Sequence, residues 1–547
     1  MIFLTDDLLL HYKRCPRRTF LDVYGDLSQQ APPPDFLLKL QQDSITHKES
    51  VLETVEKSPQ NQATPKTPAT LLLTALPSEV DISAPISPNY HHGDWEVGAR
   101  ATWDLMQQGI NCIAKPILFM PTYEGINLVS FPDLLVKYPG QSNLGDWIYV
   151  PLTIKFGRKP KADYQIISAF HAYLLTVMQE DLPEIAWLIL RRHSIHPVNL
   201  EQWMPAMIRV LAQCLETLAQ QREPEVFISR QKCSLCRWYN SCHAIAKSQK
   251  HISLLPGVTP NRYRDLQELA IADVESLAQT DITILEPVFG LDIASDLIQQ
   301  AQATVQNQPI LRQPPSRLLK ESVLTSVTED SLHPDRNLVS AALRYANYHR
   351  IPPVSDSLNL PTGLVELFFD IEAQQDLNVD YLLGILAIDR VHHTETFYPL
   401  LAEDPQDEGK IWQEFLDLVE RYPDAPIFHF SEYEVDTVKR LAKLYNTPTS
   451  QFKHLLSRFV DVHQQVIATV MLPVESYSLK HLARWLGFEW RDATVTGSQC
   501  VCLYDRWLAE RDREALDLIQ RYNEDDCRAT YHLKTWLYNF LQTHHQA

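Results

Sequence analysis

The stretch 231–242, QKCSLCRWYNSC, places Cys233, Cys236 and Cys242 in a C-x2-C-x5-C pattern. Thiolates are soft metal ligands, and three of them are one too few for a four-coordinate site. The best candidate for the fourth is Cys15 in KRCPRR, which would let a metal clasp the two ends of one domain. Four thiolates suit either zinc or an iron–sulfur cluster, and the spacing does not decide between them. The alternative, three buried free cysteines, is disfavoured by the polar residues around them.

A second set of reactive side chains is acidic and lies toward the carboxyl terminus. The segment LFFDIEA predicts a buried strand on which Asp370 and Glu372 share one face. Two adjacent carboxylates at the end of such a strand are costly unless a cation neutralises them. Further on, Glu434 lies near the start of a predicted helix, and Tyr522 and Asp526 share one face of a long amphipathic helix. For D-x-E alone, a pair of solvated acids beyond the strand end is the alternative.

Length and composition limit the architecture that must position these groups. The 547 residues exceed the usual domain size of about 100–200, so we expect two large domains or three mixed ones. A hydrophobic content of 45% is ample for packed cores. No apolar run approaches the roughly 20 residues that span a bilayer, and the amino terminus carries acids where a signal peptide has basic residues. We therefore expect no membrane partner and a cytoplasmic location, where clustered cysteines more often mean metal or catalysis than disulfides.

The charge balance is acidic. A net charge of -19 argues against a nucleic-acid partner, because phosphate binding normally leaves a basic footprint. A metal-dependent nuclease nevertheless needs carboxylates at its centre, and basic residues are concentrated in HYKRCPRR, KFGRKPK and LRRH. These clusters, which include Arg158 and Lys159, are either tracks for a phosphate backbone or ordinary solvated faces.

The pattern along the chain predicts three folded regions. Residues 1–250 alternate strands and helices and are interrupted at 57–70 by a polar, proline-rich surface insertion. Residues 251–310 form a small helical module, and 311–362 form a linker. Residues 363–547 are again α/β.

Five segments of the first region carry a resemblance. They are LHYKRCPRRTFLD, His-Lys-Glu at 47–49, FPDLLVKY around Asp133, TIKFGRKPK around Lys155, and the cysteine triad. Together they look like the RecB-family nucleases with a four-cysteine iron–sulfur cluster, a group similar to CRISPR-associated and AddB-type nuclease domains. The resemblance covers roughly residues 1–250 and implies a restriction-endonuclease-like, PD-(D/E)XK α/β domain. It also implies a mainly structural [4Fe-4S] cluster on Cys15, Cys233, Cys236 and Cys242.

The same family implies a hydrolytic centre in which His47, Asp133 and Lys155 fit the motifs. Two positions depart from the family: Thr153 stands where an acid precedes the lysine, and Ala169 replaces the tyrosine of a Gln-x3-Tyr helix. A hydroxyl is a poor substitute for an anionic oxygen in holding Mg²⁺. We therefore expect a degenerate centre that leaves a DNA-binding shell. The alternative is an active centre that uses another acid, such as Glu124 or Asp146.

The acids of the last region carry a second resemblance. D-x-E on a first strand, an acid after a later strand and Tyr-x3-Asp on a final helix are similar to the DEDD exonucleases of the RNase H-like superfamily, over about 363–540. Asp370, Glu372, Glu434 and Asp526 would hold two Mg²⁺ or Mn²⁺ ions roughly 4 Å apart, and Tyr522 would orient the attacking water. The second motif departs from Asn-x3-Asp, since Phe430 replaces the Asn and Glu434 the Asp.

Between these regions, LLPGVTPNRYRDL resembles a helix-hairpin-helix. Backbone N–H groups around Pro256, Gly257 and Val258 would contact a phosphate without reading sequence. A plain helical linker is the alternative.

Together these patterns predict a metal-dependent nuclease, a 3′–5′ exonuclease acting by a two-metal mechanism, whose first region binds nucleic acid. Single-stranded or end-bearing DNA is the favoured partner, with RNA as the alternative, and the sequence identifies no helicase or repair partner. The competing hypothesis is a non-catalytic nucleic-acid-binding scaffold in which both centres have decayed.

Overall fold

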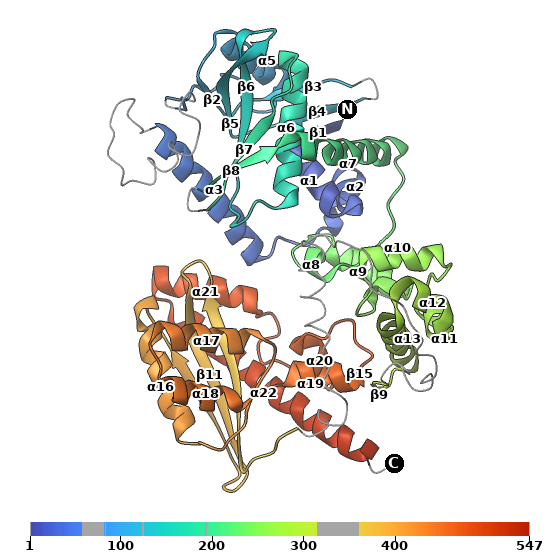
Figure 1. Ribbon diagram of the computed structural model, residues 1–547, viewed down its shortest axis with the longest axis vertical. Helices are drawn as coiled ribbons and strands as arrows, with labels where there is room; N and C mark the ends of the chain where they lie inside the picture. The colour runs from blue at the N-terminus through green and yellow to red at the C-terminus, as the bar shows by residue number, and fades with distance from the viewer. Residues whose placement is uncertain are drawn as a thin grey trace, which may run out of the picture. The chain divides into compact units, whose positions relative to one another are not determined.

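The computed structural model describes residues 2–56, 81–82, 84–122, 125–191, 194–313 and 360–545. The chain forms two compact units, Met1–Ile245 and Ala246–Ala547 (Figure 1). The insertion expected at 57–70 and nearly all of the linker expected at 311–362 lie outside the described residues. In the described ranges, no helix is both long and apolar enough to cross a membrane.

The first unit contains two β-sheets. The larger has the order β2-β5-β6-β7-β8, in which β6 and β7 are parallel and the other neighbours are antiparallel. The smaller has the order β1-β4-β3. The strands are β1 Ile2–Thr5, β2 Cys112–Ala114, β3 Leu118–Met120, β4 Ile126–Ser130, β5 Leu134–Ser142, β6 Gly145–Ile154, β7 Ile185–Ile189 and β8 Ile195–Asn199.

Helices cover the larger sheet of this unit on both faces. Helix α6 (Ala162–Gln179) contacts strands of both sheets and is apolar nearly all round because it is buried. Helix α3 (Asp35–Glu56) packs Val51 and Val55 into a core cluster with side chains of β5 and β6. The remaining helices are α1 Asp6–Arg14, α2 Pro16–Tyr24, α5 Trp95–Gln107, α7 Leu200–Gln220, α8 Arg230–Cys233 and α9 Tyr239–Ser248.

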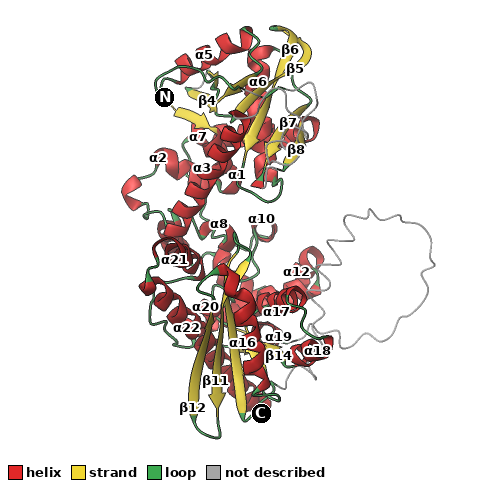
Figure 2. Cartoon of the chain, turned by 90° about the vertical axis from the view of Figure 1, so that its left-hand side faces the viewer, coloured by secondary structure: helices red, strands yellow, loops and turns green. Residues whose placement is uncertain are grey.

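The second unit is built on a five-stranded sheet with the order β12-β11-β10-β13-β14. Strands β10 (Val365–Gln374), β11 (Val379–Asp389) and β12 (Thr394–Leu401) form an antiparallel meander, and β13 (Ile427–His429) and β14 (Phe459–Asp461) continue it in parallel (Figure 2). The central strand β10 is apolar on both faces because helices cover both. Leu367 and Phe369 join the core beneath α16 (Glu408–Glu420), and Phe368 joins the core beneath α22 (Arg513–His545).

Five further helices complete this α/β region. They are α17 Tyr433–Leu444, α18 Thr449–Ser457, α19 Val462–Thr469, α20 Leu479–Trp485 and α21 Gly497–Glu510. Helix α22 runs along β10 and β11, with Lys534 Nζ 2.7 Å from Glu366 Oε1 at one end and Asn523 Nδ2 2.7 Å from Asp370 Oδ2 at the other. The helix therefore delivers its polar side chains to the same face of β10 that carries Asp370.

The helical segment after residue 250 belongs to the second unit. Its helices are α10 Pro260–Glu268, α11 Val274–Gln279, α12 Ile282–Phe289 and α13 Leu291–Gln306. Strand β9 (Ile310–Leu311) pairs with β15 (Val470–Met471), and Gln300 Nε2 donates to Leu472 O at 2.7 Å. These contacts join the helical segment to the α/β region.

Candidate active site

Three carboxylates converge at the end of β10. Asp370 and Glu372 extend from one face of the strand and Asp526 from α22, and ligand atoms of the three lie within 4.8 Å of one another. In the described part of the chain this is the one such group of three or more His, Cys, Asp or Glu side chains. None of the three forms an ion pair with a described Lys or Arg side chain, and the charge of Lys480 offsets only part of their negative charge.

The electrostatics of the group follow from this crowding. Burial raises the pKa of Asp370 well above its usual range, and repulsion from Asp526, Glu372 and Glu434 raises it further. Burial, with repulsion from Asp526, does the same to Glu372. Burial raises the pKa of Asp526 to about 7, against hydrogen bonds from Trp490 and Tyr522 and the charge of Lys480. A bound cation would relieve the cost of keeping these groups ionised.

Asn523 orients the carboxylate of Asp370. Its Nδ2 donates to Asp370 Oδ2 at 2.7 Å, and its side chain is fully buried. Gly384 on β11 pairs with Asp370 in the sheet register, and a Cβ at residue 384 would lie 1.6 Å from Asn523 Oδ1. Glycine is therefore required at 384 for the amide to reach the carboxylate. Sequence reasoning missed Asn523, although it lies three residues before Asp526 on the same helix face.

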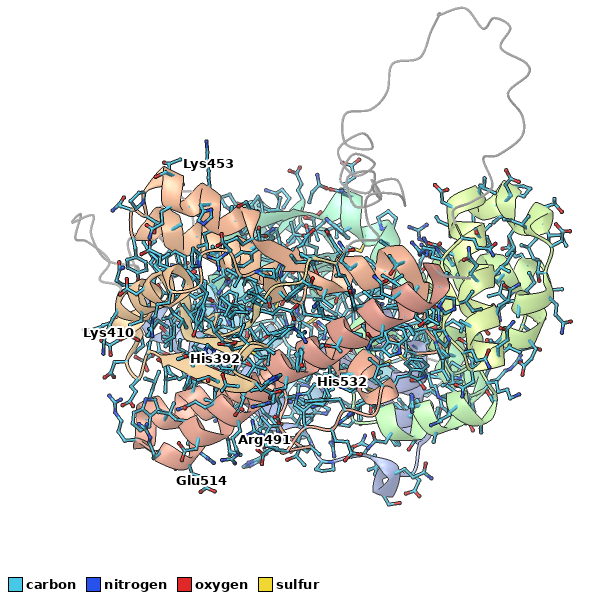
Figure 3. All side chains as sticks on the ribbon, turned by 90° about the horizontal axis from the view of Figure 1, so that it is seen from below. His392, Lys410, Lys453, Arg491, Glu514 and His532 are labelled. Atoms are coloured by element: carbon cyan, nitrogen blue, oxygen red, sulfur yellow. The ribbon has the colours of Figure 1, made fainter. Side chains whose placement is uncertain are left out.

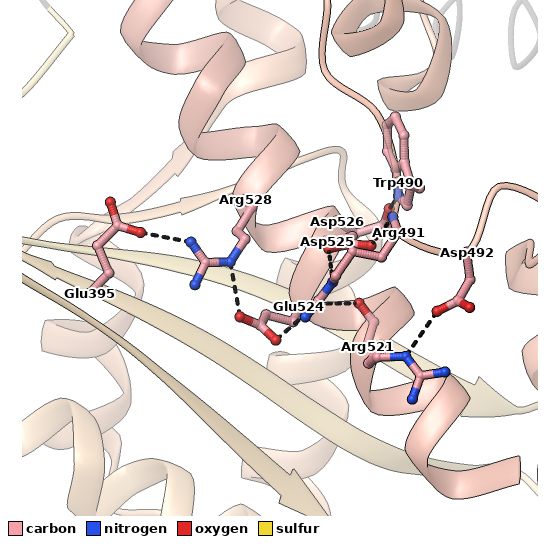
Figure 4. A network of polar contacts seen from close by, with 9 residues as sticks. All are labelled: Glu395, Trp490, Arg491, Asp492, Arg521, Glu524, Asp525, Asp526 and Arg528. Atoms are coloured by element: carbon pink, nitrogen blue, oxygen red, sulfur yellow. Dashed lines mark hydrogen bonds and ion pairs between the residues drawn. The ribbon is translucent and has the colours of Figure 1, made fainter. Parts of the chain in front are cut away.

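Trp490 orients the carboxylate of Asp526. Its Nε1 donates to Asp526 Oδ1 at 2.7 Å (Figure 4). The loop that carries Trp490 is tied to α22 by Arg491, whose backbone N and Nε donate to Asp525 at 2.9 and 2.8 Å. A further Arg491 contact reaches Glu524 at 2.9 Å, and the side chain lies partly exposed on the outside of the unit (Figure 3). Asp525 therefore holds the loop and points away from the carboxylate group, as the helix spacing predicts.

Two more side chains face the carboxylates. Tyr522 is buried, and burial together with the charges of Asp526 and Glu372 raises its pKa far above its ordinary value. The ammonium of Lys480 donates to Val495 O at 2.9 Å and lies 5.6 Å from the Trp490 ring centre and 5.8 Å from that of Tyr522. Burial lowers the pKa of Lys480. Lys480 thus places a cationic group close enough to Asp526 for its charge to lower the pKa of that carboxyl.

Glu434 lies next to this group rather than within it. It occupies the first turn of α17, is buried, and contributes to the raised pKa of Asp370. Its Oε2 lies 3.5 Å from His429 Nδ1, and it is not among the three residues whose ligand atoms lie mutually within 4.8 Å. Phe430 packs against the core beneath α22 with its ring 4.9 Å from that of His463. The longer acid at 434 thus faces a histidine, and the aromatic residue at 430 serves packing.

In the first unit, the structure gathers the residues of the predicted hydrolytic centre around the end of β6. Asp133 Oδ2 accepts from Ile154 N at 2.6 Å, and Asp133 Oδ1 lies 2.9 Å from Lys48 Nζ. The His47 ring lies 5.8 Å from that of Phe156, next to Lys155. Burial lowers the pKa of Lys48, but the ion pair with Asp133 outweighs it and raises the pKa overall. A lysine ammonium thus neutralises the one acid of this centre that the sequence identified.

The other polar residues considered for that centre differ in where the structure places them. Thr153 is buried, and its hydroxyl has no hydrogen-bond partner among the described residues. Asp146 lies near the start of β6, eight residues from the end of the strand, which is about 26 Å at the rise of an extended chain. It is therefore too far from Lys155 to act with it. Glu124 lies outside the described residues. Asp6, which the sequence did not single out, is buried, and burial raises its pKa to about 7.

The four cysteines are neighbours within the first unit. Cys15 lies at the break between α1 and α2, where Pro16 starts the second helix, and the others lie in and around α8 and α9. Burial raises the pKa of Cys233 to about 11, and the thiols of Cys15, Cys236 and Cys242 add to the shift. All nine cysteines are free thiols.

Hydrogen bonds hold the two cysteine-bearing segments together. Trp238 Nε1 donates to Asp22 Oδ1 at 2.7 Å, Lys232 Nζ donates to Arg14 O at 3.1 Å, and Ala31 N donates to Arg237 O at 2.9 Å. The start and the end of the first unit are therefore in contact at the cysteines.

The residues predicted to contact phosphate lie in a turn at 256–258 and on an exposed loop at 158–159. Gly257 has φ +87°, and the Val258 N–H donates to Leu255 O at 3.3 Å, so this amide is already used within the turn that follows Pro256. In the first unit, Arg158 and Lys159 are exposed on the loop between β6 and α6. Both sites remain predictions.

Comparison with known proteins adds one finding. No curated protein matches the chain. Residues 367–538 match the family model of the RNase H superfamily, a range that contains β11–β14, all of β10 but its first two residues, and all three clustered carboxylates. The carboxyl-terminal part of the chain is therefore RNase H-like, which indicates a nuclease-like function.

Proposed function

We propose that the second unit is a divalent-metal-dependent exonuclease that hydrolyses phosphodiester bonds from the 3′ end of a nucleic-acid strand. The observation that carries this proposal is the convergence of Asp370, Glu372 and Asp526, with ligand atoms mutually within 4.8 Å, inside an RNase H-like domain. The order of the acids along the chain, which resembles that of the DEDD exonucleases, supports the 3′–5′ assignment.

The donor set fits a hard divalent cation. All the donors are carboxylate oxygens, which Mg²⁺ and Mn²⁺ prefer. Glu372 is buried and Asp370 and Asp526 are half-buried; the three groups repel one another and have no cationic side chain paired with them in the described part of the chain. When bound, two such ions activate water and stabilise the leaving 3′ oxygen of an in-line phosphoryl displacement. Glu434, beside Asp370, would extend the donor set to the second ion.

The side chains around the carboxylates keep them oriented. Asn523 directs one oxygen of Asp370 and Trp490 one oxygen of Asp526, while Tyr522 also hydrogen-bonds to Asp526. Tyr522 presents a neutral hydroxyl next to Asp526, because its pKa is raised far above physiological pH, so it can hold a water in place. Lys480 supplies positive charge for a phosphate near Asp526.

For the first unit, we propose a structural [4Fe-4S] cluster on Cys15, Cys233, Cys236 and Cys242. Thiolates that share one tetrahedral zinc would lie about 3.8 Å apart. The four thiols are not among the described groups whose ligand atoms lie mutually within 4.8 Å. A four-iron cluster, whose own iron and sulfide atoms separate the cysteines, does not require the thiolates to lie that close to one another. The Ser229 N–H, 3.3 Å from Cys233 Sγ, would stabilise a thiolate there.

We further propose that this unit binds nucleic acid without cutting it, as a RecB-like domain whose hydrolytic centre is degenerate. Two observations support this reading. Lys48 pairs with Asp133, and Thr153 supplies no carboxylate. Arg158 and Lys159 remain exposed for phosphate contacts.

The test uses the full chain, Mg²⁺ or Mn²⁺, and matched 5′-labelled single strands of DNA and RNA. Wild type should shorten at least one of them stepwise from the 3′ end, and Asp370→Ala should not. Glu414→Gln, an exposed acid on α16, is the matched control and should behave as wild type. No degradation by wild type, or equal degradation by Asp370→Ala, rejects the assignment.

The competing function is a non-catalytic nucleic-acid-binding scaffold. Phe430 and the placement of Glu434 outside the three-carboxylate group favour it. Calorimetric titration with Mn²⁺ separates the two proposals, because a scaffold should bind no pair of ions that Asp526→Asn abolishes.

A further inference from the structure

A pocket of about 480 Å³ opens beside Glu434, at the carboxyl ends of the parallel strands β13 and β14. Ligands of open α/β sheets commonly bind at this edge, and the volume falls within the range of small-molecule sites. The pocket is lined by residues of β13, β14, α17 with its N-cap, α18 and α19, among them His429, Glu432, Asp436, Lys439, Phe459 and Asp461.

The pocket is joined to the carboxylate group through His429. That side chain is buried and lines the pocket, while its Nδ1 lies 3.5 Å from Glu434 Oε2, at the outer limit of a hydrogen bond. The negative charge of Glu434 in turn raises the pKa of Asp370. A group bound in the pocket would therefore be separated from Glu434, one of the proposed metal ligands, by the His429 side chain alone.

The charge of the lining excludes phosphate. Three carboxylates, those of Glu432, Asp436 and Asp461, face a single ammonium, Lys439, which is already paired with Asp436 at 3.1 Å. A phosphodiester would meet net negative charge there. A neutral group that offers N–H donors would meet acceptors instead.

The walls suit a flat ring. The His429 and Phe459 rings lie 5.4 Å apart and are tilted, and Val435 and Leu456 add aliphatic surface. Nucleobases stack on aromatic side chains, and the exocyclic amino groups of adenine, cytosine and guanine donate to carboxylates, whereas thymine and uracil carry no such group.

We propose that this pocket binds one base of the strand being degraded and favours bases that carry an exocyclic amino group. The inference rests on the proposed nuclease function. One hydrogen bond of ordinary net strength, about 1 kcal/mol in a pocket that is open to solvent, corresponds to a preference of about three- to tenfold over thymine at that position.

The experiment places a single cytosine at successive positions from the 3′ end of an otherwise all-thymidine strand and measures kcat/KM with the full chain and Mn²⁺. One position should show a cytosine-to-thymine ratio of about three to ten. In Leu456→Trp, which fills the pocket, and in Glu432→Ala/Asp436→Ala, which changes only exposed acids, the ratio should fall to about one. Glu414→Gln should keep the wild-type ratio, and an abasic residue at the sensitive position should be cleaved no faster than thymidine.

A wild-type ratio of one at every position, or a preference that persists in both pocket variants, overturns the proposal. An abasic residue that is cleaved as fast as cytosine also overturns it, because the pocket then senses the sugar. If wild type cleaves none of the strands, the nuclease function itself fails, which is a different outcome from uniform cleavage of all of them.

Discussion

Removal of divalent cations should make the stability of the second unit depend on pH through Asp526. Three buried or half-buried carboxylates have ligand atoms within 4.8 Å of one another and have no ion-pair partner among the described Lys and Arg side chains. Without a metal, the folded protein lowers this repulsion by taking up protons. With a metal bound, the carboxylates stay ionised and the proton is not needed.

The magnitude follows from the pKa of Asp526, which burial raises from 3.8 to about 7. Each pKa unit corresponds to 1.36 kcal/mol, so the shift is worth about 4 kcal/mol. Because the folded-state pKa lies above the unfolded value, the stabilising contribution is complete below pH 3.8 and is lost as the pH rises to 7. About 3 kcal/mol of the loss falls between pH 5 and pH 8.

The assay is thermal unfolding of the full chain in EDTA, following the transition that responds to Mn²⁺. A unit of about 300 residues has an unfolding entropy of about 0.6 kcal/mol/K, so Tm should be about 4 °C lower at pH 8 than at pH 5. Excess Mg²⁺ should remove the difference, and Asp526→Asn should reduce it in EDTA. Glu414→Gln should leave it unchanged.

Two results would refute this reasoning. One is a Tm in EDTA that falls equally with pH in wild type and Asp526→Asn. The other is a pH dependence that Mg²⁺ leaves intact, since the carboxylates would then not be the groups that bind the ion.

Asn523→Ala and Gly384→Ala should each lower Mn²⁺ affinity or kcat about 10- to 100-fold in calorimetry and steady-state assays, because both free the Asp370 carboxylate. Lys534→Met should cost about 1–3 kcal/mol in chemical denaturation, because the buried Glu366 then keeps only the partly exposed Arg390 as a described ion-pair partner, and adding Glu366→Gln should recover part of the loss. Cys233→Ser should abolish bound iron and the visible absorbance of the anaerobically purified protein; wild type that is colourless and contains zinc would contradict the cluster.

Much of the second unit could be predicted from the sequence because its signals are local. The apolar run before Asp370 indicated a strand buried on both faces, and the two-residue spacing to Glu372 put both acids on one face. The helical period of the last segment likewise set Asp526 apart from Asp525. Strand and helix periodicities are properties of neighbouring residues, so no long-range information was needed.

The partners of these acids could not be predicted, because they depend on contacts between distant segments. Trp490 reaches Asp526 from a loop that carries no motif of its own, and the loop is positioned by Arg491 on Asp525. Gly384 is necessary only because Asn523 packs against β11. In the sequence, Lys48 is recognisable only as the middle residue of a His-Lys-Glu triplet. Its salt bridge to Asp133 joins residues 85 positions apart, so the local sequence does not predict it.

The carboxylates of the two units differ in the charge of the groups that contact them, and this difference indicates which unit binds a divalent metal ion. In the first unit, Lys48 brings a permanent positive charge to Asp133, so a divalent ion would have to displace an ammonium from this acid, and the charges of Lys155 and Lys48 also act on the neighbouring buried Asp6. In the second, the surrounding groups donate neutral hydrogen bonds to Asp370 and Asp526, and the described lysine beside them is bonded to Val495 O rather than to a carboxylate. Binding of Mg²⁺ stabilises a site little when a lysine already neutralises its carboxylate. It stabilises a site much more when the carboxylates remain anionic. The affinity for divalent ions should therefore reside in the second unit, and with it the hydrolysis.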